Sequence, residues 1–250
     1  AMTGIPVATL KDMEQVFDAF NLTDKTPLTF LKTLPWDVSL SGEGEGFSMK
    51  GRVNLEGASL QLGNLTVGFP GTYDENIVFE LGINPREGRV DIDSAILRLR
   101  ESQVNMTGSF DLHEKRIVRF GVHSTGLDLK DLSVVSEERE IFSGGVLKGY
   151  LDLTLPLKDE DEPLITGVTE GTGLSFQAGS NSPLISDCSF QADFSGKSAT
   201  LNRCDLKAGE DSDLSITGEI RGWGGIEGDI KVHSDYLNLS DIIHKGSELS

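Results

Sequence analysis

The sequence is poor in the basic residues that nucleic-acid binding requires. Its 250 residues include 22 Lys and Arg against 40 Asp and Glu, which gives a net charge of −18. Phosphate backbones bind clustered Lys and Arg, so this balance excludes nucleic acid as a partner. It also disfavours flat docking on an anionic membrane surface, but it leaves open the binding of lipid tails in an apolar groove.

Cysteine and long apolar runs are almost absent. The only cysteines are Cys188 and Cys204, which are too few for a disulfide scaffold and lack metal-site spacing. No apolar run approaches the ~18–20 residues of a membrane-spanning helix, and no signal peptide is visible. The opening Ala1-Met2-Thr3 is typical of a cloning remnant, so we expect a soluble piece of a longer protein.

The common catalytic motifs are missing as well. Gly196-Lys197-Ser198 has the end of a phosphate-binding loop, but the upstream glycine would fall at Gln191. There is no nucleophile elbow and no zinc-protease motif. His123 and His233 occupy matched positions on polar faces, which favours surface histidines over a metal or acid–base pair. We therefore predict a non-enzyme without cofactor or metal.

What the sequence does contain is an internal repeat. Residues 104–132 and 214–242 align without a gap, 110 residues apart. Thr107-Gly108 matches Thr217-Gly218, and Val122 matches Val232. Self-similarity at a fixed period is typical of repeat architectures, in which each unit buries its apolar face against a neighbour. The repeat favours an extended surface or conduit over a compact enzyme.

From about Trp36 onward, apolar and polar residues alternate. In one run Val104, Met106 and Phe110 occupy even positions and would share one face of a strand, whereas the polar residues at the odd positions would lie on the other face. The 29 glycines recur between such runs, and both Asn84-Pro85 and Gly144-Gly145 are predicted turns. Clean alternation indicates antiparallel sheet with one dry face and one wet face.

We predict a mainly β fold, in which a repeated antiparallel β-meander forms a curved, twisted sheet shaped as an open trough. Short helices are expected only at the N-terminus. One is capped by Thr9, and a second begins at Thr26-Pro27. The predicted divisions are a helical segment (1–40), a first β repeat (41–158) and a second β repeat (159–250).

A family resemblance lies in the order of features between Thr26 and Leu112. These are a Pro-Leu-x-Phe-Leu-x-x-Leu segment at 27–34, an extended run at 37–40, and the stretches 57–62, 88–92 and 102–112. The segment 127–132 resembles the short stretch that ends such units. In this order the chain resembles the AsmA-like family of bacterial envelope proteins, and TamB-like relatives fit the same pattern.

The resemblance implies a parent protein anchored in the inner membrane, with its bulk in the periplasm. It also implies a β trough that carries phospholipid or assists outer-membrane biogenesis, and no catalytic residues to transfer. The anchor expected of this family is missing from the sequence, consistent with a fragment.

The apolar parity identifies the residues that would line such a trough. Covering alkyl chains there is worth ~0.8 kcal/mol per CH₂ group removed from water. The same face could instead be an ordinary packed core, which would make the chain a structural or adhesive β-repeat module. A carbohydrate-active enzyme with paired carboxylates is a more distant alternative. The predicted lipid-groove residues are Val104, Met106, Phe110, Val118, Phe120, Leu151, Leu153, Leu155, Leu214, Ile216, Ile220, Ile230 and Val232.

Gly196 is the midpoint between Cys188 and Cys204. A hairpin with its loop at 195–197 predicts that the two cysteines lie directly opposite each other, with Cα atoms ~4.5–5.5 Å apart. That separation suits a disulfide, which an oxidising periplasm permits. A disulfide and two buried free thiols both remain open.

Overall fold

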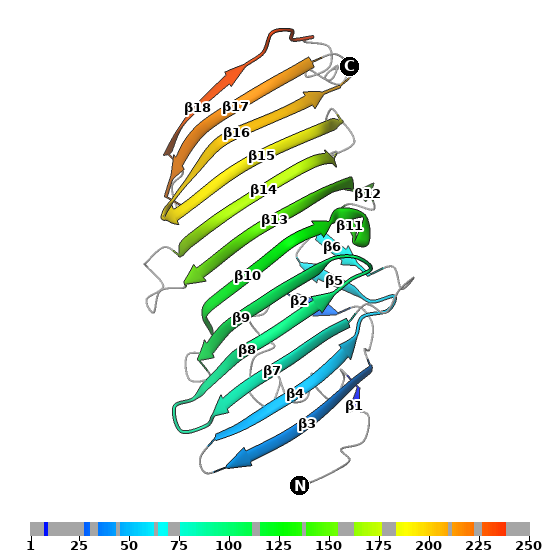
Figure 1. The fold of residues 1–250 in the computed structure, drawn as a ribbon, viewed down its shortest axis with the longest axis vertical. Helices are drawn as coiled ribbons and strands as arrows, with labels where there is room; N and C mark the ends of the chain where they lie inside the picture. Colours follow the sequence, from blue (N-terminus) through cyan, green and yellow to red (C-terminus); the bar gives the residue numbers. More distant parts are fainter. Residues whose placement is uncertain are drawn as a thin grey trace, which may run out of the picture.

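Strands make up most of the chain, and they form two antiparallel sheets (Figure 1). The computed structural model describes residues 8–9, 28–30, 35–43, 46–62, 65–69, 76–111, 116–136, 139–154, 163–176, 184–209, 212–222 and 227–238. Within these ranges the only helix is one 3-10 turn, η1 (Leu129–Asp131). The mainly β prediction is therefore confirmed.

The main sheet has 13 strands, and among the described residues β1 and β18 lie at its two edges. Each hydrogen-bonded neighbour is antiparallel, and the order across the sheet follows the order along the chain. In this order the strands are β1 (Ala8–Thr9), β3 (Pro35–Glu43), β4 (Gly46–Asn54), β7 (Asn76–Asn84), β8 (Arg89–Arg98), β9 (Gln103–Asp111), β10 (Arg116–Asp128), β13 (Phe142–Thr154), β14 (Leu164–Phe176), β15 (Ile185–Gly196), β16 (Ser198–Ala208), β17 (Ser212–Arg221) and β18 (Glu227–His233).

The smaller sheet consists of two pairs of strands, each of which lies in the sequence between two strands of the main sheet, and of one strand near the N-terminus. It lies behind the main sheet in Figure 1, near the middle of the molecule. Its five strands, in spatial order, are β12 (Arg139–Glu140), β11 (Ser133–Ser136), β6 (Leu65–Gly68), β5 (Ser59–Leu62) and β2 (Leu28–Phe30). The main sheet can thus remain sequential while one of its faces is partly overlaid.

Tight turns explain why consecutive strands are antiparallel neighbours. The predicted turn at Asn84-Pro85 joins β7 to β8, and Gly88 closes it with a φ of 61° and an N–H donated to the Pro85 carbonyl. Such left-handed backbone is readily adopted by glycine. Gly144-Gly145 does not turn, contrary to prediction, because both residues lie inside β13, where Gly145 (φ 111°) sits at an irregularity of the ladder.

The prediction of a second N-terminal helix is wrong where the structure describes it. Residues 28–30 form β2, and Leu28 pairs with Leu62 of β5. Alternating Leu28 and Phe30 suits a strand as well as a helix, and pairing with β5 decides between them. Thr9, the predicted cap of the first helix, lies in β1, and the remainder of that predicted helix falls outside the described residues.

The internal repeat is a β-hairpin that has the same register in both copies. Met106 pairs with Val122 in the first copy, and the equivalent Ile216 pairs with Val232 in the second. The backbone environment is repeated too. A Cβ on Gly108 would lie 2.7 Å from the Arg119 carbonyl oxygen, and one on its repeat equivalent Gly218 would lie 2.4 Å from that of Asp229.

A pair of buried serines extends the repeat by two residues beyond the sequence alignment. The Ser102 hydroxyl accepts a hydrogen bond from the Asp128 backbone N–H, and the Ser212 hydroxyl accepts one from the Asn238 N–H, both at 2.9 Å. The serines are only 4% and 1% exposed. Each hydroxyl therefore ties the chain leaving the hairpin to the start of its first strand.

Two small clusters of buried apolar side chains lie at one end of the strands. The first contains Leu55, Ala58, Phe69 and Leu99. The second contains Leu129, Leu174, Cys188 and Cys204. The main sheet is thus held together largely by its backbone ladder and by cross-strand side-chain pairs.

Phenylalanines on the apolar face lie directly opposite glycines on neighbouring strands. These pairs are Phe47 with Gly42, Phe79 with Gly51, Phe120 with Gly108, Phe194 with Gly167, and Phe190 with Gly171. The Phe190 ring contacts its glycine closely, since a Cβ on Gly171 would lie 2.4 Å from Phe190 Cε1 and 2.7 Å from Leu174 Cδ1. The glycines therefore provide space that any side chain would remove.

We expect Gly171→Ala to lower the free energy of unfolding by about 1–3 kcal/mol, because Phe190 and Leu174 must leave their positions. Urea unfolding measures the change. Gly126→Ala is the matched control, because its new Cβ would meet only Val146 Cγ1 at 3.6 Å, and it should change stability by less than about 0.5 kcal/mol. Equal stability of the two variants would contradict the close-contact explanation.

Candidate functional site

Three rows of apolar side chains run across the main sheet on one face. We call them the apolar rows, and each follows directly paired residues from strand to strand, with Gly51 and Gly167 in the path of the first row and Gly108 in that of the second. The first row is Val38, Phe79, Ala95, Met106, Val122, Leu151, Phe194, Ala199 and Ile220. The second is Leu40, Met49, Leu81, Ile92, Phe120, Leu153 and Ile165. The third is Phe47, Ile83, Val90 and Phe110.

The side chains of the apolar rows are only partly covered. In the first two rows, Ala95 and Ala199 are buried, while Leu40 is 47% exposed and the others are half-buried. Phe47 in the third row is 40% exposed. Neither packed cluster includes members of these rows among the described residues. The apolar rows therefore form an accessible apolar surface, in contrast to the tightly packed end of the strands.

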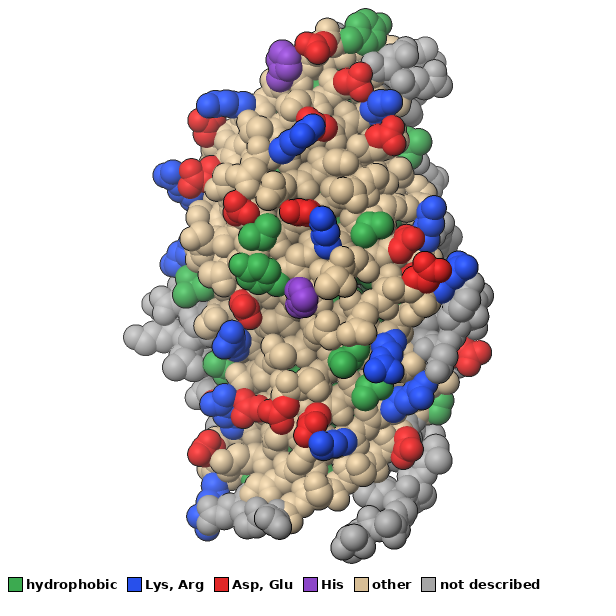
Figure 2. Space-filling model, viewed as in Figure 1, with side chains coloured by type: hydrophobic (Ala, Val, Ile, Leu, Met, Phe, Trp, Pro, Cys, Tyr) green, Lys and Arg blue, Asp and Glu red, His purple; other side chains and the backbone are tan. Residues whose placement is uncertain are grey.

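The opposite face of the sheet is polar. Lys50 and Glu80 form an ion pair at 2.7 Å across neighbouring strands, as do Lys148 and Glu170. Figure 2 shows this face, with acidic and basic side chains interspersed over the strands. Exposed pairs of this kind contribute at most about 1 kcal/mol each. Their main consequence is that the two faces of one sheet differ sharply in polarity.

Most of the predicted groove residues lie on the apolar face. Met106, Phe110, Phe120, Leu151, Leu153 and Ile220 belong to the apolar rows. Nearer the packed end, Val104 is buried at 7% exposure, and Leu214 and Ile216 are half-buried.

Four of the predicted groove residues need separate mention. Ile230 and Val232 lie on the edge strand β18, at 61% and 60% exposure. Val118 stands at a bulge in β10, where the register shifts between Ile117 and Arg119, so it has no direct partner on β9. Leu155 lies outside the described residues.

Sequence reasoning missed the part of the face that comes from β4, β7 and β8. Phe79, Leu81 and Ile83 alternate along β7 in the same way as the residues that were identified on β9. The period-two pattern could have found them. Ile92 and Ala95 could not be paired by parity, since a bulge in β8 between them changes the register.

The two cysteines are free thiols, and they are not directly opposite each other. Cys204 pairs with Phe190, and Cys188 pairs with Leu174 of β14. The predicted register is wrong because the hairpin loop has two residues, with Ser195 opposite Ser198, and because a bulge shifts the ladder between Gln191 and Ala192.

The thiols nevertheless meet within the second packed cluster. Burial raises the pKa of Cys188 to about 12, with further contributions from the Cys204 charge and from a hydrogen bond between the two thiols. Burial also raises the pKa of Cys204, an effect opposed by that hydrogen bond. Both groups are therefore protonated and poorly nucleophilic near neutral pH.

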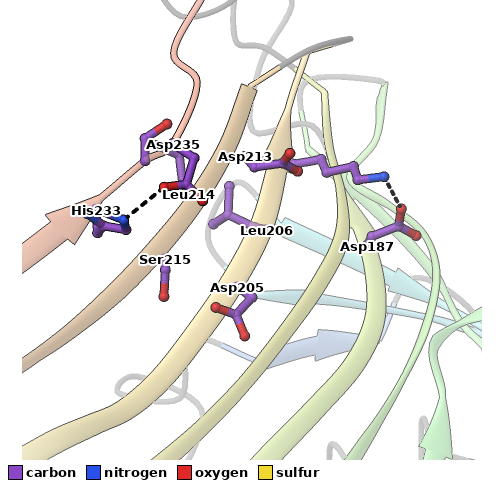
Figure 3. Close-up of a pocket in the computed structure, with 10 residues that line it drawn as sticks. Asp187, Asp205, Leu206, Asp213, Leu214, Ser215, His233 and Asp235 are labelled. Atoms are coloured by element: carbon purple, nitrogen blue, oxygen red, sulfur yellow. Dashed lines mark hydrogen bonds and ion pairs between the residues drawn. The ribbon is translucent and has the colours of Figure 1, made fainter.

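A shallow hollow of about 220 Å³ lies at the end of strands β15 to β18 (Figure 3). Two of its four acidic side chains have a basic neighbour in the lining: Asp187 lies 3.5 Å from Lys207, and Asp235 lies 3.2 Å from His233. Hydrogen bonds from Arg203 and then Ser215 lower the pKa of Asp205. Within the described ranges, no three His, Cys, Asp or Glu side chains gather as metal ligands.

Searches against protein-family models, curated proteins and solved structures gave no match to this chain. In the part of the chain that the structure describes, no helix has the length and hydropathy needed to cross a membrane.

The buried Cys188 thiol makes stability depend on alkaline pH. Its pKa is about 12 in the folded protein against 9.0 for an ordinary thiol, so only the unfolded chain loses this proton just above pH 9. The contribution of the protonated Cys188 thiol to the free energy of unfolding is fully present below pH 9 and is lost as the pH rises toward 12. Between these limits we expect Cys188 to lower the free energy of unfolding by about 1.4 kcal/mol per pH unit.

Urea unfolding at pH 8 and pH 10.5 in the presence of reductant measures this slope. Cys188→Ala is the comparison, because it removes the thiol and leaves other alkaline titrations in place. Its stability should fall less steeply with pH than that of the wild type. Parallel pH profiles would show that Cys188 is not the group responsible.

Proposed function

We propose that the chain is a non-catalytic periplasmic segment of an AsmA-like protein. In this proposal the apolar rows form an open trough that holds phospholipid acyl chains during lipid transport or outer-membrane biogenesis. The observation that carries it is the continuity of partly exposed apolar side chains across the strands of an unclosed sheet. A soluble monomeric domain rarely leaves so large an apolar surface without a use for it.

The dimensions of the face suit lipid tails. Its 13 strands, spaced ~4.8 Å apart, give a sheet about 58 Å across. The hydrocarbon core of a bilayer is ~30 Å thick and contains two layers of tails, so the sheet is several tails long. Each CH₂ group that the rows cover contributes ~0.8 kcal/mol. The energy of binding therefore comes from an extended contact and requires no specific pocket.

The charge distribution supports the same function. The polar face keeps the sheet hydrated, and the net charge of −18 opposes flat adsorption on an anionic membrane. Lipid would then be held by its tails, with its headgroup in water. Phe–Gly pairs favour this mode of binding, because rings placed over glycines give the face low relief.

The alternative is a structural or adhesive module whose apolar face is ordinary core. The first packed cluster favours it locally, since Val53, Ile77 and Leu97 pack there against Leu55 and Phe69. The apolar rows lie further along the same strands and are only partly covered. A module whose core was complete would cover them too.

Photo-crosslinking in a bacterial envelope tests lipid contact at single positions. Benzoylphenylalanine in place of Leu151 should crosslink to phospholipid, because Leu151 lies in the first apolar row. Tyr150 is the matched control, since it is the preceding residue of β13, on the opposite face, and is 50% exposed. We expect at least fivefold more lipid adduct by mass spectrometry at position 151.

A charge on the apolar face gives a second readout. Leu151→Glu should abolish co-purification of phospholipid in native mass spectrometry, whereas Tyr150→Glu should retain it. Circular dichroism of both variants checks that the sheet persists. Equal lipid adducts at 150 and 151, or wild-type protein that never carries lipid, would support the structural-module alternative.

A further inference from the structure

The edge strand β18 carries an uncovered continuation of the apolar face. All seven of its residues are exposed, and Ile230 and Val232 on its apolar side are 61% and 60% exposed. On its outer side, every second residue directs its backbone N–H and C=O away from β17, because antiparallel ladders use alternate residues for each neighbour. The strand therefore presents both hydrogen-bonding groups and apolar side chains to an incoming strand.

The repeat indicates what such an edge normally carries. In the first copy, β10 is the equivalent of β18, and its outer edge pairs with β13 between Arg119 and Asp128. There Val122 lies opposite Leu151, and Phe120 lies opposite Leu153. Val232 and Ile230 are the repeat equivalents of Val122 and Phe120. The second copy thus repeats the surface that accepts a strand in the first.

The sequence of β18 is complementary to itself in an antiparallel arrangement. If Ile230 is placed opposite Ile230 of a second copy, Asp229 lies opposite Lys231 and Lys231 lies opposite Asp229. Glu227 then lies opposite His233, and Val232 lies opposite Gly228, which has no side chain. Directly opposed residues of opposite charge stabilise a strand pair, and like charges destabilise it. The polar face and the apolar face both match under this two-fold relation.

Asp229 gains further from such a partner. Within one copy, Asp229 lies directly opposite Glu219 of β17. Glu219 forms an ion pair with Arg221 at 2.9 Å. A second copy would bring Lys231 to the other side of Asp229. This arrangement supplies a cation to a position that otherwise places two carboxylates on neighbouring strands.

We propose that β18 is a dimerisation edge, and that two copies of this chain pair β18 to β18 about a two-fold axis at Ile230. Side chains opposite each other in a ladder point to the same face, so the apolar faces of both copies join into one surface. This pairing does not depend on lipid binding.

Pairing of β18 with the opposite edge of another copy would give a different assembly. Such head-to-tail contacts continue from copy to copy and produce open chains of molecules. The two-fold arrangement closes at two copies. The dimer and the open chain therefore differ both in mass and in the residue that faces Ile230.

Analytical ultracentrifugation over a concentration series tests the assembly and its charge pattern. The wild-type chain should show a monomer–dimer equilibrium that stops at the dimer. Lys231→Glu and Asp229→Lys should each weaken dimerisation at least tenfold, since each places like charges opposite each other twice in the dimer. The double variant Asp229→Lys with Lys231→Asp exchanges the charges and should restore the wild-type dissociation constant within about threefold.

Cysteine crosslinking tests the register. Ile230→Cys should form an intermolecular disulfide under mild oxidation, because residues opposite each other have Cα atoms ~4.5–5.5 Å apart. Val232→Cys is the control, since the two copies of position 232 would lie roughly 13 Å apart along the strand. The native cysteines are buried and should not contribute.

Three outcomes would overturn the proposal. A wild-type chain that stays monomeric throughout the series would show that β18 does not pair with a second copy. Growth beyond the dimer would indicate head-to-tail pairing. A dimer in which Val232→Cys crosslinks as well as Ile230→Cys, or which survives both single charge variants, would place the contact elsewhere.

Discussion

The continuous antiparallel backbone ladder is the constraint on which this structure depends. Each central strand satisfies its N–H and C=O groups through two neighbours, so the sheet does not need a full second layer to hold its strands in place. The two clusters of buried apolar side chains both lie at one end of the strands. An accessible apolar surface can therefore coexist with an ordered sheet, which a fold stabilised mainly by a central core could not maintain.

Local devices keep this ladder in register. Buried Ser102 and Ser212 accept backbone N–H groups at equivalent places and fix where each hairpin ends. In the first copy Ser102 also donates to the Asp131 carboxylate at 2.6 Å, which secures η1 and directs the chain away from the main sheet toward β11. A short polar network thus determines where the sheet is interrupted and where the smaller sheet begins.

The sequence predicts the larger features because they rest on periodicity. Alternation along 103–112 gives the strand and its faces, and the gapless repeat gives a hairpin of equal register in both copies. The failures come from single residues with non-local causes. One bulge and a two-residue loop displaced Cys204 from Cys188, and pairing with β5 made a strand at 28–30 where a local signal favoured helix. Periodicity also identifies one face as apolar, but the extent of its coverage depends on distant segments such as β5, β6 and β11.

The repeated hairpin has a consequence for how such a sheet can vary in length. A hairpin contains two strands, so the addition or removal of a whole hairpin returns the chain to the same end of the strands. It also leaves the parity of every later strand unchanged, and the apolar side chains stay on one face. The buried serine at each hairpin marks a joint at which this unit begins and closes. Sheets of this design can thus differ in span by whole hairpins while preserving the polarity of both surfaces, whereas a single added strand would reverse the direction of all that follow.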